Sequence, residues 1–306
     1  MAKITYFYAE DNKQSSAAFL QLPLFHRLVE FFLKHEGQRI ILRKLKAAFP
    51  EADSLDQLVE NLVSAKLLIR NDRNYQLAFP IYTEEQVLLL PKVRTSDLAS
   101  LKLIANAKGS LFLGEILWYY FFEKTPTYFF GLTADAANHY PCYERQEFAN
   151  DDLSFVSISK KGQEPLTLPN YFNQLTRNDQ NPIFTNLLEH IGDVNPSYFM
   201  QQAKRIIKQA QKHRSVSQKP NIFLESLLTT GIVKVIDGSL CMNVPNERRA
   251  EVQLWRSAFE ETMASIFHFE KQQQLNQHQQ ILFRTQLFAE LMTASEQETF
   301  AYILFG

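Results

Sequence analysis

The chain has 306 residues, 45% of them hydrophobic, which is enough to form a sizeable buried core in about two domains. Its 32 basic and 33 acidic side chains give a net charge of -1, which excludes a global electrostatic attraction to nucleic acid or another polyanion. Any such binding must depend on local patches. The two cysteines, Cys142 and Cys241, provide neither a disulfide framework nor a zinc-ligand set.

The sequence has no pattern typical of a signal peptide or a membrane span. The first residues, MAKITYFYAEDNKQ, lack an uninterrupted apolar region. The longest apolar stretch, residues 111–122, is about half the length needed to cross a bilayer, and Glu115 interrupts it. These features predict a cytoplasmic protein with no membrane partner.

The first third of the chain has the pattern of three helices followed by a hairpin. Apolar residues at helical spacing predict a helix over 23–37 and a shorter second helix that ends at Pro50. A third helix is predicted to start after Ser54. Two short apolar runs around the polar turn NDRN predict a hairpin over 67–82.

This order, over roughly residues 20–82, resembles the winged-helix domain. The resemblance implies a DNA-binding fold whose third helix enters the major groove and whose hairpin forms the wing. The same segment also resembles a bacterial family known only as a domain of unknown function, and that resemblance implies no activity.

An internal repeat extends the resemblance to the second half of the chain. Residues 58–80 align without a gap with residues 223–245, and residues 23–31 match 182–190. In the longer alignment four pairs are identical: Glu60 with Glu225, Leu62 with Leu227, Asp72 with Asp237, and Pro80 with Pro245. The repeat predicts a second winged-helix unit.

Shorter matches follow each copy, because residues 112–117 resemble 287–292 and residues 128–131 resemble 303–306. They predict that each half ends in a short Phe-rich strand and that the two strands pair across a pseudo-twofold axis. The unmatched residues 132–165 have the pattern of a hairpin.

We therefore predict an α+β fold that is predominantly α, with two winged-helix-like domains related by internal duplication, added helices and short β-hairpin elements. The predicted divisions are a first winged-helix-like domain at 1–93, a helix plus β-hairpin connecting region at 94–168, a second winged-helix-like domain at 169–245, and C-terminal helices with a terminal strand at 246–306.

Motifs of known enzyme classes are absent from the sequence, including phosphate-binding glycine loops, His-Glu-x-x-His and Gly-x-Ser-x-Gly. We predict a non-enzymatic protein with no cofactor and no metal site. The remote alternative is an unrecognised enzyme around His139 and Cys142, in which the imidazole would activate the thiol.

Local basic patches are the strongest functional signal. Residues 195–223 contain no acidic side chain, and Lys204, Lys208 and Lys212 recur at intervals of four on one helical face. The second predicted helix of the first copy and its hairpin tip are also basic. The candidate phosphate contacts are Arg39, Arg43, Lys44, Lys46, Arg70, Arg73, Lys204, Arg205, Lys208, Lys212 and Arg214.

The third predicted helix of each copy has the opposite charge. Residues 53–65 contain Asp53, Asp56 and Glu60 and no basic side chain, and the equivalent segment of the second copy contains only Glu225. Carboxylates facing DNA phosphates would be repelled, which disfavours sequence-specific recognition by this helix.

Two functions remain open from the sequence. The favoured one is a nucleic-acid-associated or transcription-regulatory protein that makes non-specific phosphate contacts with DNA. The alternative is a scaffold or homodimerisation module that binds a protein partner without DNA.

Overall fold

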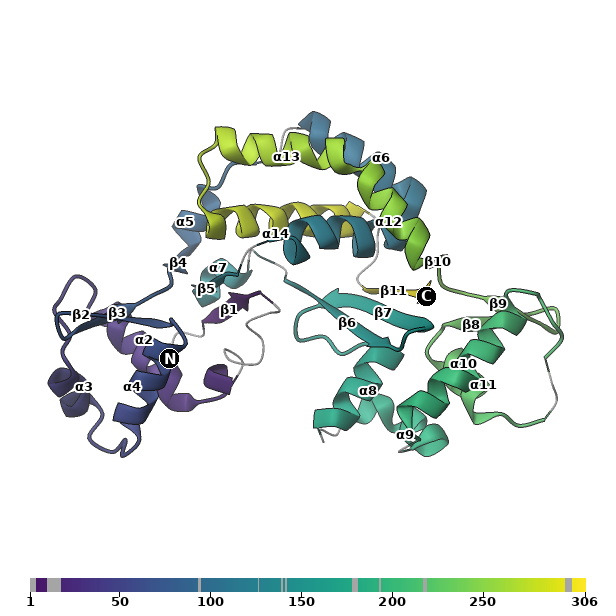
Figure 1. Ribbon diagram of the computed structural model, residues 1–306, viewed down its shortest axis with the longest axis horizontal. Helices are drawn as coiled ribbons and strands as arrows, with labels where there is room; N and C mark the ends of the chain where they lie inside the picture. Colours follow the sequence, from purple (N-terminus) through teal and green to yellow (C-terminus); the bar gives the residue numbers. More distant parts are fainter. Residues whose placement is uncertain are drawn as a thin grey trace. The chain divides into compact units, whose positions relative to one another are not determined.

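The computed structural model has two compact units, each built from several stretches of the chain. It describes residues 4–9, 18–92, 95–125, 127–138, 140, 142–177, 181–192, 194–216, 219–294 and 299–306. Unit 1 comprises Met1–Lys92, Phe121–Tyr140 and Gln274–Phe283. Unit 2 comprises Val93–Tyr120, Pro141–Gln273 and Arg284–Gly306. Figure 1 labels the helices and strands, which form the predicted mixture of α-helices and small sheets.

Unit 1 contains the predicted three helices and hairpin. The helices are α2 (Pro23–Lys34), α3 (Leu42–Ala48) and α4 (Leu55–Ser64), and the hairpin strands are β2 (Leu68–Asn71) and β3 (Asn74–Leu77). Helix α2 begins at a proline, whose missing N–H costs nothing at that position, and buries Phe25, Leu28, Val29 and Phe32 at helical spacing. These side chains share one core with the buried residues of α4 and the hairpin.

A segment between α2 and α3 pairs with the hairpin. The backbone N–H of Tyr75 donates a 2.8 Å hydrogen bond to the Ile40 carbonyl, and the Ile40 N–H donates to Asn74 Oδ1 at 2.7 Å. These bonds fix the start of α3 against β3.

The second part of unit 1 is a three-stranded sheet in the order β1 (Thr5–Tyr8), β5 (Phe129–Leu132), β4 (Ile81–Tyr82). Strand β5 is antiparallel to β1 and parallel to β4, and the Gly131 N–H donates a 3.0 Å hydrogen bond to the Pro80 carbonyl. The short helices α5 (Glu84–Leu88) and α7 (Ala134–Asn138) contact each other beside it.

The sheet of unit 2 has the order β10 (Asn246–Arg248), β11 (Thr299–Phe305), β7 (Leu153–Lys160), β6 (Tyr143–Ala149). Strand β11 is parallel to β10 and antiparallel to β7, and the Ile303 N–H donates a 3.0 Å hydrogen bond to the Pro245 carbonyl. The predicted pairing of the two Phe-rich strands is wrong, because β5 and β11 are each the inner partner of their own sheet.

Unit 2 also contains helices that precede a second hairpin. They are α8 (Leu168–Arg177), the 3-10 helix η4 (Pro182–Phe184), α9 (Thr185–Ile191), α10 (Pro196–Ala210) and α11 (Ile222–Thr229), followed by β8 (Val233–Ile236) and β9 (Ser239–Met242). A bridge joins Ser215 to Ser239 in β9. The bridging segment thus follows α10, whereas in unit 1 the corresponding segment follows α2, the helix before α3.

The remaining helices are α6 (Thr95–Leu111), the π-helical segments η2 (Phe112–Leu117) and η3 (Tyr119–Glu123), α12 (Arg249–Ala258), α13 (Glu260–Gln272) and α14 (Gln277–Ala294). Within unit 2, η2 contacts α12, and α6 contacts β11. Phe259 lies at the junction between α12 and α13.

A buried polar network connects η2, β6, β11 and α12 in unit 2. The Glu115 carboxylate accepts hydrogen bonds from Arg145 at 2.8 Å, from Arg256 at 3.1 Å and from the Tyr302 hydroxyl at 2.7 Å. Burial raises the pKa of Tyr302 far above its usual value, so this hydroxyl stays protonated and donates. The partners compensate the desolvation of a carboxylate inside an apolar helix.

A second carboxylate, Glu147, lies beside the first network. It accepts hydrogen bonds from Arg145 at 2.7 Å and from Arg249 at 2.8 Å, and Arg249 also bonds Ser154. Burial raises the pKa of Glu147, but the positive charge of Arg145 and the hydrogen bonds it accepts outweigh burial and hold that pKa below its usual value.

The network predicts acid sensitivity of unit 2. Because the folded-state pKa of Glu147 lies below the unfolded value near 4.5, its stabilising contribution is complete above that value and is lost as the pH falls through the folded-state pKa. We expect Glu147→Gln to lower the free energy of unfolding at neutral pH and to flatten its decline toward about pH 3. Urea denaturation across this range measures both, with Glu261→Gln on the exposed face of α13 as the control. Parallel pH profiles for Glu147→Gln and the unmodified protein would contradict the assignment.

Gly114 is required for close packing of η2 against β11. A Cβ atom at this position would overlap the ring and hydroxyl of Tyr302, which is completely buried. Gly114→Ala is expected to lower the free energy of unfolding by about 2 kcal/mol or more, since neither the backbone of η2 nor the buried ring of Tyr302 has room to move away from the added methyl group. Chemical denaturation tests this result against Ser257→Ala, an exposed helical position on α12 that should change stability by about 0.5 kcal/mol at most.

Candidate functional site

Five of the predicted phosphate contacts in unit 1 surround one hollow of about 670 Å³. Its eight lining residues are Arg39, Ile41, Leu42, Arg43, Lys44, Arg70, Arg73 and Tyr75, and we refer to it as the basic hollow. None of these eight residues is acidic. The structure therefore brings together basic side chains that lie about 30 residues apart in the sequence.

Three elements position the lining residues. Arg39 and Ile41 come from the segment that pairs with the hairpin. The first turn of α3 provides Leu42, Arg43 and Lys44, and the hairpin provides Arg70 from β2, Arg73 from the tip and Tyr75 from β3. The Arg39 guanidinium donates a 3.1 Å hydrogen bond to the Asp72 carbonyl. This bond joins two walls of the hollow in addition to the backbone bonds of Ile40.

The charge of the basic hollow is only partly neutralised. Arg70 forms a 3.2 Å ion pair with Glu60 of α4 and lies over the ring of Tyr75. Lys44 Nζ donates to Gln38 Oε1 at 2.8 Å, and this neutral amide does not offset the positive charge of the lysine. Within the described part of the chain, Arg39, Arg43, Lys44 and Arg73 have no carboxylate at ion-pairing distance.

Lys46, the sixth basic candidate of unit 1, does not line the hollow. Its ammonium group forms a 2.6 Å ion pair with Asp56 of α4. Both ion pairs place a basic side chain on an acidic residue of α4. The negative face that disfavours DNA contact by α4 is therefore partly neutralised.

The hairpin tip has an unusual backbone at Arg73. Asp72 and Arg73 have φ values of 47° and 60°, as the central residues of a type I′ turn require. The matching tip in unit 2 has φ values of 48° at Asp237 and 74° at Gly238. Glycine adopts this conformation without steric cost, whereas arginine does so at a cost of about 1–2 kcal/mol.

The basic candidates of unit 2 form a stripe on α10 and the turn that follows it. Arg205, Lys208, Lys212 and Arg214 are exposed. Lys204 forms a 2.9 Å ion pair with Asp152, and this pair holds the pKa of the Asp152 carboxyl below its usual value. The stripe is thus a surface rather than a hollow, and one of its three regularly spaced lysines has an acidic partner.

The alternative thiol chemistry has little support in the described residues. His139 lies outside them, and burial raises the pKa of the Cys142 thiol to about 12, which disfavours the reactive thiolate. The described residues contain no group of three or more His, Cys, Asp or Glu side chains placed to hold a metal ion. None of the described helices combines the length and apolar character needed to cross a membrane.

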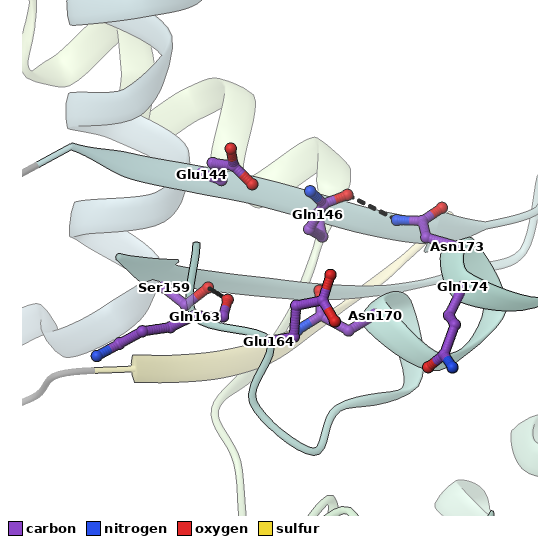
Figure 2. Close-up of a pocket in the computed structure, with 8 residues that line it drawn as sticks. All are labelled: Glu144, Gln146, Ser159, Gln163, Glu164, Asn170, Asn173 and Gln174. Carbon is purple, nitrogen blue, oxygen red and sulfur yellow. Dashed lines mark hydrogen bonds between the residues drawn. The ribbon is translucent and has the colours of Figure 1, made fainter. Parts of the chain in front are cut away.

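A second hollow lies in unit 2, beside β6, β7 and α8 (Figure 2). It is about 30 Å³ in volume, and its lining is entirely polar: Glu144, Gln146, Ser159, Gln163, Glu164, Asn170, Asn173 and Gln174. Figure 2 shows the 2.6 Å hydrogen bond between Asn173 and Gln146 across it. Two carboxylates and a volume suited to one water molecule make it unsuitable for a phosphate group.

The sequence predicts the cations of the basic hollow but not its apolar lining. The apolar residues Ile41, Leu42 and Tyr75 lie close in the sequence to the predicted basic residues, which was the available signal. The Glu115 network was also missed, and a single glutamate within an apolar run was its only indication.

Residues 5–106 match a family model described as a domain of unknown function, DUF1803. This range includes every residue that lines the basic hollow, and it agrees with the resemblance of this segment to an uncharacterised domain. No curated protein and no solved structure gives a significant match to the chain.

The turn geometry predicts that Arg73 lowers stability. Arg73→Gly should raise the free energy of unfolding by about 1 kcal/mol, because it removes the left-handed strain and leaves the hairpin pairing intact. The reciprocal change Gly238→Arg should lower it by a similar amount, since the space at Gly238 is open and only the backbone conformation opposes a side chain. Thermal and urea denaturation measure both. A destabilised Arg73→Gly variant would show that the arginine side chain contributes more to the fold than its strain costs.

Proposed function

We propose that this protein is a non-enzymatic tandem winged-helix protein that associates with nucleic acid through phosphate contacts made in the basic hollow of unit 1. A transcription-regulatory role is compatible with this activity. The proposal includes the internal duplication of the winged-helix unit.

The order of elements in unit 1 supports a winged-helix assignment. A first helix, a short segment at Ile40, two further helices and a hairpin follow one another, and the segment is hydrogen-bonded to β3. The hairpin then corresponds to the wing, and α4 to the helix that usually enters the major groove.

Matching details in the two halves support duplication. Each hairpin turns through two residues with positive φ, and after each closing proline the chain forms a strand parallel to the last strand of its half. The proline carbonyls of Pro80 and Pro245 accept equivalent hydrogen bonds from those last strands. The bridging segment differs, since it precedes α3 in one half and follows α10 in the other, so the two basic helices are not in equivalent positions.

The observation that carries the functional proposal is the convergence of five basic side chains on one hollow without an acidic residue. Phosphate oxygens are the ligands that arginine and lysine bind most effectively in such clusters. The hollow is also held in place by the hydrogen bonds of Arg39 and Ile40, so binding requires little ordering of the backbone. Arg73 further supports a role in binding, because the chain retains a strained residue at a position where glycine would be more stable.

The acidic face of α4 limits the specificity that we propose. Asp56 and Glu60 are exposed, and both are held by basic side chains of the neighbouring elements. Helix α4 itself contains no lysine or arginine that could contact base edges in the major groove. Binding through phosphates alone is independent of sequence.

Salt-dependent retention on heparin and on random-sequence DNA tests the proposal. We expect retention at low salt that decreases steeply as salt rises, and complete loss of retention in an Arg43→Glu, Lys44→Glu variant. The salt slope is the slope of log affinity against log salt concentration, and Arg43→Ala alone should reduce it by about 1, the value for one lost phosphate contact. Lys46→Ala is the matched control, because this lysine lies on the same helix but bonds to Asp56 instead of lining the hollow.

The α10 stripe provides a second comparison. A Lys204→Glu, Lys208→Glu, Lys212→Glu variant should keep most of the retention if the basic hollow is the main contact. Loss of retention in this variant alone would move the phosphate site to unit 2. An unmodified protein that is not retained even at low salt would overturn the proposal and favour a scaffold that binds another protein.

A further inference from the structure

We infer that the basic hollow binds single-stranded nucleic acid, with an unpaired base against its apolar floor and phosphates on its cationic rim. This inference rests on the proposed function and specifies the form of nucleic acid that the hollow accepts. It follows from the lining, the volume and the charge of the neighbouring helix.

The lining combines two kinds of surface. Ile41 and Leu42 are its apolar part, Tyr75 is covered by Arg70, and five basic side chains line the same hollow. A duplex presents phosphates, sugars and base edges on its outside and keeps the faces of its bases stacked within, so it has no base face to place on Ile41. An unpaired nucleotide has both, because its base is attached through the sugar to the phosphate beside it.

Ile41 is the exposed apolar side chain that lies among the cations of the hollow. This side chain is 38% exposed at the N-terminal boundary of α3, whereas its neighbour Ile40 is 2% exposed in the core. Binding of a base would cover an isoleucine that folding leaves in water. A cavity of about 670 Å³ lies within the usual range of roughly 300–1,000 Å³ for sites that enclose small organic groups.

Arg70 provides the planar surface of the hollow. Its guanidinium carbon lies 5.6 Å from the centre of the Tyr75 ring, and Tyr75 itself is 2% exposed. The tyrosine ring is therefore covered, and the guanidinium rather than the ring is available to a base. Bases in single strands commonly stack on arginine planes as well as on aromatic rings. The ion pair with Glu60 holds Arg70 in this position.

The charge of α4 opposes a duplex more than a single strand. A duplex is stiff and places phosphates along a broad surface, so contact with the basic hollow would bring others near the exposed Asp53 and the only partly neutralised Asp56 and Glu60. A flexible strand can enter the hollow and leave without following α4. The same five cations then bind a single strand with less repulsion.

The test compares one labelled oligonucleotide in two forms. A fluorescent single strand of about 15 nucleotides, and the same strand annealed to its complement, are titrated with the full chain at several salt concentrations. We expect the single strand to bind at least about tenfold more tightly than the duplex. Equal binding, or tighter binding of the duplex, would overturn the inference and leave the phosphate proposal standing. Failure of both forms and of heparin to bind would overturn both.

Two exposed isoleucines provide a matched pair of variants. Ile41→Ala should weaken single-strand binding about fivefold without changing the salt slope, because it removes apolar contact and no charge. Ile69, which is 39% exposed on β2, does not line the hollow, so Ile69→Ala should leave binding unchanged. Equal effects of the two substitutions would contradict a base at Ile41.

Arg70→Lys separates stacking from charge. The lysine keeps the positive charge but has no planar group, so we expect weaker binding of the single strand and an unchanged salt slope. Arg73→Gly should instead reduce the slope by about 0.7, the value for one lost phosphate contact on a single strand. Since Arg73→Gly is expected to be more stable than the unmodified protein, its weaker binding could not be attributed to unfolding.

Discussion

The backbone hydrogen bond from Gly131 to the Pro80 carbonyl determines how the first half of the chain is organised. It joins β5 to the sheet of unit 1, although residues 93–120, which precede β5 in the sequence, belong to unit 2. The bond from Ile303 to Pro245 has the same place in the sheet of unit 2. In each half a proline ends the hairpin, and its carbonyl accepts a hydrogen bond from a strand that lies much later in the sequence.

A consequence of this pairing is a reciprocal exchange of helical segments. Unit 2 contains residues 93–120 from the first half, and unit 1 contains residues 274–283 from the second. Ile281 and Leu282 of the latter segment pack in one core with Tyr82 and Phe130. Gly114 and Glu115 of the former segment meet Tyr302 of β11. Each unit therefore needs both halves of the chain in order to complete its core.

Local features were predictable from the sequence, and long-range pairings were not. The helices of residues 23–64 and both hairpins follow from apolar spacing, prolines and turn residues, which act within a few positions. Strand partners depend on which distant segments share a core, and no local pattern specifies them. The C-terminal match illustrates the difference: it aligned residue 131 with residue 306, whereas the hydrogen bonds to the two prolines make Gly131 equivalent to Ile303. The basic hollow was partly predictable for the same reason, since its charges are local but their convergence is not.

The left-handed conformation of Arg73 has a consequence for how this turn can change over time. Glycine at this position would satisfy the turn geometry better, so selection for stability alone would replace the arginine. Selection for anion binding would retain it. In a protein that shares residues 5–106, glycine at this turn position would remove the strain, and any other side chain there would retain it.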